Sequence, residues 1–299
     1  MKRLTLFEFP SNLGLREPSP RHEPGVKKLP DWLRQHGFHE RIAPAKVVRI
    51  QPPPYTMVLD EETGVRNTDS IIRYAKQQAE VLCEEISSSF CLALGGDCSI
   101  LIGSALALKR SGNYGLFYLD GHHDFMFPSL SQSGGAAGMD LAIATGHGHR
   151  KLTDIDGLGP YIEEENVWCL GNREFDDDYV DPILATRIHY RDLPALRKEG
   201  METCAKSFLE MVDRRELDGF FIHLDVDVLN DELMPAVDSR TPGGLSYEEL
   251  GLLLTMVLAH EGAVGLQITI LDPELDPEGV YTSQFVDRFC HFFKSAVNR

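Results

Sequence analysis

The chain has 299 residues, of which 42% are hydrophobic and 25% are charged, enough apolar material for a large α/β core. Its 29 Lys and Arg residues face 46 Asp and Glu residues, which gives a formal net charge of −17. Such an acidic chain is a poor candidate for binding nucleic-acid phosphates or anionic membranes, and a divalent cation or a cationic small molecule is a better expected ligand.

The predicted elements alternate between short β-rich runs and amphipathic helical windows. Strands are expected at 4–9, 46–50, 90–94, 114–119, 166–170, 219–226 and 264–271, and helices at 69–87, 99–110, 202–215, 246–260 and 282–297. Several of these strands have apolar residues at both their odd and their even positions, as expected when helices cover both faces of a sheet. The order predicts one α/β domain over residues 1–299, with an open, mostly parallel sheet between two helical layers.

The cysteines and the N-terminus indicate a cytoplasmic protein. None of the six Cys residues forms a CxxC pair, and most lie in apolar runs, which favours reduced thiols over a disulfide framework. The first residues, MKRLTLFEFPSNLG, contain too short an apolar run for a signal peptide, and no stretch approaches the ~18 apolar residues of a membrane span.

Polar clusters follow three of the predicted strands. GGDCS (95–99) follows the third strand, DGHHD (120–124) follows the fourth, and DVD (225–227) lies at the end of the sixth. Ligands of open α/β sheets bind at the carboxyl ends of the strands. The sequence therefore predicts that these acids converge on one rim of the sheet.

The alternation of side chains along an extended segment then indicates which side chains can meet. In an extended segment, Asp120, His122 and Asp124 point to one side, and Asp225 and Asp227 likewise share a side. Carboxylates gathered in one cleft raise each other's pKa unless a cation neutralises them. Oxygen donors with an imidazole suit Mn²⁺ or Mg²⁺, and two ions balance the charge better than one. His223 lies deeper in its strand and is interpreted as a hydrogen-bonded core histidine.

GGDCS, DGHHD and HLDVDVLN, in this order and at these separations, resemble the motifs of the ureohydrolases, the family of arginase, agmatinase and formimidoylglutamase. The resemblance covers roughly residues 88–275. It implies a three-layer α/β/α sandwich, a homotrimer or homohexamer, and two Mn²⁺ ions. It also implies hydrolysis of a linear guanidine or amidine C–N bond by a hydroxide that bridges the metals.

The resemblance also assigns ligands. Asp120 and Asp225 would bridge the metals, His122 and Asp227 would complete one site, and Asp124 would join the other and accept a proton from the bridging water.

Cys98 stands where the family has a His ligand. As a thiolate it would still bind metal, and it would shift the preference toward Zn²⁺, Fe²⁺ or Co²⁺. Ser133 and Asp176 match residues that contact the substrate in the family.

Three other family positions are changed. Ala137 replaces the proton-shuttling His, Ile270 replaces the Glu that holds the guanidinium group, and Met126 replaces an Asn that helps to hold the substrate carboxylate. His147 and His149, in TGHGHR, are the candidates to replace the missing shuttle.

These changes leave two other functions open. The chain could be a degenerate family member that binds metal or a ligand without hydrolysis. Alternatively, Asp120, His122 and Asp225 resemble the ligands of single-metal, deacetylase-like hydrolases, which share the fold.

Overall fold

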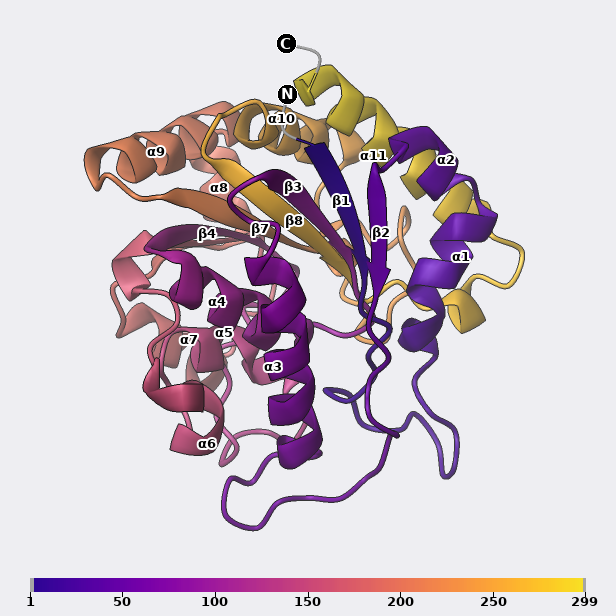
Figure 1. Cartoon of the computed structure of the whole chain (residues 1–299), viewed down its shortest axis with the longest axis vertical. Helices are drawn as coiled ribbons and strands as arrows, with labels where there is room; N and C mark the ends of the chain where they lie inside the picture. The colour runs from indigo at the N-terminus through magenta and orange to yellow at the C-terminus, as the bar shows by residue number, and fades with distance from the viewer. Residues whose placement is uncertain (1–2, 298–299) are drawn as a thin grey trace.

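The computed structural model describes residues 3–297 and is built around an eight-stranded sheet whose neighbouring strands all run parallel (Figure 1). The strand order is β2-β1-β3-β8-β7-β4-β5-β6. The strands are β1 (Arg3–Glu8), β2 (Lys46–Arg49), β3 (Ser89–Leu94), β4 (Tyr114–Leu119), β5 (Val167–Leu170), β6 (His189–Arg191), β7 (Gly219–Asp225) and β8 (Ala263–Thr269). The predicted parallel sheet is thereby confirmed, and the three-residue edge strand β6 is an addition to it.

Helices cover both faces of the sheet (Figure 1). One layer contains α3 (Thr68–Cys83), α4 (Ile100–Ser111), α5 (Asp140–Ala144), α6 (Arg150–Thr153) and α7 (Asp177–Leu184). The other contains α1 (Leu29–Gln35), α2 (Phe38–Ile42), α8 (Leu193–Glu199), α9 (Met201–Arg214), α10 (Tyr247–Leu258) and α11 (Val280–Val297). The three-layer sandwich expected from the sequence is confirmed.

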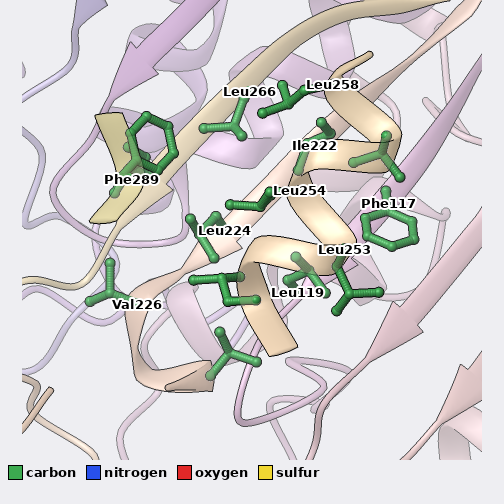
Figure 2. Close-up of a cluster of buried hydrophobic side chains, with 14 of the residues drawn as sticks. Phe117, Leu119, Ile222, Leu224, Val226, Leu253, Leu254, Leu258, Leu266 and Phe289 are labelled. Atoms are coloured by element: carbon green, nitrogen blue, oxygen red, sulfur yellow. The ribbon is translucent and has the colours of Figure 1, made fainter. Parts of the chain in front are cut away.

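Alternation along the central strands divides the core into two clusters. Phe117 and Leu119 of β4 point toward α9, α10 and α11, whereas Leu116 and Tyr118 point toward the layer of α3 and α4. Figure 2 shows the first cluster, in which Leu253, Leu254 and Leu258 of α10 pack against β4, β7 and β8. Burying each such side chain contributes about 1.5–3 kcal/mol, so the middle of the sheet is a rigid support for the loops at its carboxyl edge.

Among the described helices, none combines the length and the apolar character that crossing a bilayer requires.

Candidate metal centre

The three predicted polar clusters meet at the carboxyl edge of the central strands. Potential ligand atoms within 4.8 Å of one another form three overlapping groups: Cys98–Asp120–His223–Asp225, Cys98–Asp124–Asp140 and Asp120–His122–Asp227. All six residues that the sequence analysis names as metal ligands occur in these groups. Two further residues, His223 and Asp140, also take part.

The loops that carry the cluster depend on a contact with the N-terminal segment. Ser11 Oγ donates to Asp97 Oδ2 (2.8 Å), and Asp97 Oδ1 accepts from the Ser99 backbone N–H (2.9 Å). A Cβ atom at Gly96 would lie 1.7 Å from the Ser11 carbonyl oxygen. Only Gly therefore permits this close packing, which fixes the position of Cys98 two residues later.

We call Asp120, His122 and Asp227 the outer group, and it contains a matched ion pair. His122 Nδ1 lies 2.9 Å from Asp227 Oδ2, and Asp227 Oδ1 accepts from the Gly121 N–H (2.9 Å). Burial opposes the charge on His122, but the Asp227 carboxylate outweighs it and raises the pKa of His122 to about 9. Burial likewise opposes the charge on Asp227, yet His122 and then Arg173 hold its pKa below the usual range.

We call Cys98, His223 and Asp225 together with Asp124 and Asp140 the inner group, and its charges are not matched. Cys98 Sγ donates to Asp225 Oδ2 (2.8 Å) and lies 3.1 Å from Thr269 Oγ1. Burial, followed by repulsion from Asp227 and Asp120, raises the pKa of Asp225 well above its usual range. Burial and the neighbouring acids also raise the pKa of the Cys98 thiol.

A single hydroxyl joins three acids at the centre of the site. Tyr118 Oη lies 2.9 Å from Asp120 Oδ2, 3.0 Å from Asp124 Oδ2 and 2.9 Å from Asp140 Oδ1. The hydroxyl has one proton and can donate to only one of the three. Burial and the charge of Asp120 raise the pKa values of Asp124 and Asp140 well above the usual range. The three acids therefore cannot all ionise without a cation.

His223 lies against this hydroxyl network from β7. Its ring stacks on Tyr118, with centroids 4.3 Å apart and planes 6° apart. His223 Nδ1 lies 2.6 Å from Gln267 Nε2, whereas Nε2 is buried without a hydrogen-bond partner, 3.8 Å from Asp120 Oδ2. The interpretation of His223 as a core histidine thus holds for one ring nitrogen, and the other faces the acidic cluster.

Comparison with known proteins identifies the family of the chain. The family model of the arginase family matches residues 16–292. The chain belongs to the arginase family. It is 31% identical over 301 residues to an arginase of Staphylococcus aureus (strain MRSA252), covering 98% of this chain and 97% of that protein. The solved arginase structures of Bacillus caldovelox (TM-score 0.87, 26% identity) and Bacillus cereus (0.84, 27%) each cover 98% of both chains.

Ala137 and Ile270 are two of the positions at which the family resemblance implies that a catalytic or substrate-binding side chain has been replaced. Ala137 is buried, and its N–H donates to the Gly14 carbonyl (3.1 Å). Ile270 is also buried, and its N–H donates to the Gly96 carbonyl (2.7 Å) at a φ of +75°. A β-branched residue rarely adopts this left-handed conformation, and the strain costs on the order of 1–3 kcal/mol.

The remaining predicted residues have other immediate partners. His147 Nε2 pairs with Glu164 (2.7 Å), and His149 Nδ1 accepts from the Lys151 N–H at the start of α6 (3.3 Å). Ser133 Oγ accepts from the Gly135 N–H (3.1 Å), and Asp176 caps α7 through the Asp178 N–H (3.1 Å). The roles of these four residues in proton transfer and substrate binding remain predictions.

Sequence reasoning missed Asp140 and Asp238. Asp140 follows the small-residue loop GGAAG, and a carboxylate beside such a loop was the only available signal. Asp238 is exposed, and the negative charge of Asp227 repels its carboxylate. Of the two, only Asp238 is open to solvent, since Asp140 is fully buried.

Proposed function

We propose that this arginase-family protein is a metal-dependent hydrolase of linear C–N bonds in amidine or guanidine compounds. The convergence of Asp120, Asp124, Asp225 and Asp227 on one edge of an apolar sheet carries the proposal. Uncompensated buried carboxylates are costly, and divalent cations compensate them.

The donor atoms fit two divalent ions. Carboxylate oxygens and imidazole nitrogens suit Mn²⁺, and the Cys98 sulfur makes Zn²⁺, Fe²⁺ or Co²⁺ the alternatives. Two buried atoms without hydrogen-bond partners, His223 Nε2 and Asp140 Oδ2, face or adjoin the cluster. When bound, such ions lower the pKa of a water molecule from ~15.7 to about 7.

The residues of this chain then have separate tasks. Asp124 accepts a proton at its carboxylate, and His147 or His149 exchanges protons with solvent after a movement of their loop. Ser133 and Asp176 orient the polar end of the substrate. Because Ile270 cannot bind a cation, the exposed carboxylate of Asp238 binds the substrate's positive group.

The test is a matrix of metals and substrates. Protein loaded with Mn²⁺, Co²⁺, Zn²⁺ or Fe²⁺ is assayed for urea or ammonia release from arginine, agmatine, guanidinobutyrate, hydroxyarginine and formiminoglutamate. Asp225→Ala should lower kcat/KM at least about 10³-fold, since it removes a ligand of the metal centre. Asp213→Ala, on the exposed surface of α9, is the matched control and should retain full activity.

Absence of turnover in every combination would overturn the proposal. Retained metal binding would then favour a non-hydrolytic family member, an alternative supported by the missing groups at Ala137 and Ile270. Elemental analysis that finds one ion per chain would instead favour the deacetylase-like alternative. A homotrimer or homohexamer in the cytoplasm remains the expectation, and light scattering on the purified chain measures the assembly.

A further inference from the structure

We infer that His223 is a metal ligand, and that with Cys98, Asp120 and Asp225 it forms a site of mixed sulfur, nitrogen and oxygen donors. This site lies deeper than the outer group of Asp120, His122 and Asp227. The inference rests on the metal binding of the proposed function and does not require turnover.

The unpartnered nitrogen of His223 is the first observation. The residue is fully buried, and its Nε2 has no hydrogen-bond partner, since the 3.8 Å to Asp120 Oδ2 is too long for one. Buried polar atoms are nearly always paired, so an orphaned nitrogen aimed at a group of acids indicates an absent ligand.

The spacing of the donors is the second observation. Cys98 Sγ, a carboxylate oxygen of Asp120, a ring nitrogen of His223 and a carboxylate oxygen of Asp225 all lie within 4.8 Å of one another. Four ligands at about 2.0–2.3 Å from a tetrahedral ion are separated by roughly 3–4 Å. Small side-chain movements are therefore enough to close the site around an ion.

The surroundings of His223 can prepare Nε2 for this role. Ser104 Oγ lies 2.8 Å from Gln267 Oε1, and Gln267 Nε2 lies 2.6 Å from His223 Nδ1. A half-turn of the Gln267 amide keeps both hydrogen bonds, because the Ser104 hydroxyl can accept as well as donate. Nδ1–H then donates to Gln267 and the Nε2 lone pair faces the acids, which is the usual support of a ligating histidine.

Charge favours His223 over Asp140 as the added ligand. Cys98 as a thiolate with Asp120 and Asp225 already brings three negative charges, and a neutral imidazole adds a donor without adding a fourth. Asp140 would add one, and its Oδ1 already contacts the Tyr118 hydroxyl. Sulfur and imidazole donors together favour Zn²⁺, Co²⁺ or Fe²⁺ over Mn²⁺ at this site.

Variants of the full-length chain test the inference by metal titration. In His223→Asn, affinity for one of two Zn²⁺ or Co²⁺ equivalents should fall at least about 100-fold, because even outer-shell partners of ligands are worth 10–100-fold. His189→Asn is the matched control. His189 lies in the edge strand β6, where its ring stacks on Trp168, and its replacement should leave both metal affinities unchanged. Unchanged affinity in His223→Asn would overturn the inference.

A rescue separates ligation from a structural role. Adding Cys98→His to His223→Asn returns an imidazole to the same group and should restore at least part of the lost Zn²⁺ affinity. If His223 only packs against Tyr118, the second substitution should not restore it, and that result would contradict the inference.

Spectroscopy of the unmodified protein is independent of whether the variants fold. X-ray absorption of the protein with two Zn²⁺ ions should show an average of one imidazole per ion, from His122 and His223, and a Zn–S contribution from Cys98. Half an imidazole per ion would overturn the inference. Ligation by His223 without turnover would contradict only the proposed function, and turnover without this ligation would contradict only the inference.

Discussion

The outer and inner groups of the metal centre adjoin at Asp120 but differ in how their buried charges are balanced. In the outer group, His122 and the neighbouring Arg173 hold the pKa of Asp227 below its usual range. In the inner group, no cation lies among Cys98, Asp124, Asp140 and Asp225 in the part of the chain that the structure describes, and the pKa of each is raised. The outer group therefore carries its own countercharge, whereas the inner group depends on protons or on metal ions.

The substitution with the largest expected effect on stability disrupts the outer group. Asp227→Asn leaves His122 and Arg173 without their buried carboxylate, and removing one partner of a buried pair typically costs 3–5 kcal/mol. The free energy of unfolding of the metal-free protein should fall by about 3 kcal/mol, as measured by urea denaturation. A change below about 1 kcal/mol would show that the outer group is not a balanced pair.

Metal ions should remove the difference between the two groups. At a free metal concentration about 100 times the Kd, the stability should rise by about 2.7 kcal/mol, and a chelator should reverse the gain. Thermal unfolding of the chelated and the metal-loaded protein measures it.

The gain should also grow with pH. The raised pKa values of Asp124, Asp140 and Asp225 mean that their contribution to stability is present below about pH 3.9, the unfolded value, and is lost as pH rises through the folded values. The contribution of His122 is likewise present below about pH 6.5 and lost as pH rises through about 9. Metal ions bind the deprotonated ligands and so bind better as pH rises. The difference in Tm between the two forms should therefore widen from about pH 5.5 to 8, and a constant difference would contradict this account.

A smaller effect tests the hydroxyl that holds the inner acids. Tyr118→Phe removes the shared contact of Asp120, Asp124 and Asp140 and keeps the aromatic ring against His223. Leaving buried polar groups unsatisfied should cost about 2 kcal/mol in the metal-free protein. Tyr161→Phe, whose hydroxyl bonds only backbone groups far from the metal centre along the chain, is a control for the loss of a buried hydroxyl.

The smallest effect has the opposite sign. Asp225→Asn keeps the shape of the side chain but removes one buried acid that must otherwise be protonated or neutralised, so the metal-free protein should gain about 1 kcal/mol. The same variant should lose metal affinity, and calorimetry measures both quantities. Destabilisation of the metal-free protein by Asp225→Asn would show that the two groups do not differ as described.

Much of the fold was predictable because the central strands have apolar residues at both odd and even positions and end in polar clusters. The edge strand β6 was not, since its three residues are only half-buried and carry no such pattern. The convergence of Asp120, Asp124, Asp225 and Asp227 followed from their places at strand ends. Asp140 and Asp238 could not be placed in this way, because neither follows a strand: Asp140 begins the short helix α5, and Asp238 lies in an irregular loop. The support of Asp97 by Ser11 is a contact across 86 positions, which no local pattern reveals.

The left-handed turn at Ile270 has a consequence for redesign. Its backbone is held by the hydrogen bond to the Gly96 carbonyl and by the end of β8, and an unbranched side chain would carry less strain at its positive φ. We therefore expect substitutions at residue 270 to change the polarity next to the metal centre while the backbone hydrogen bond is kept, so this position is a suitable one at which to alter substrate preference.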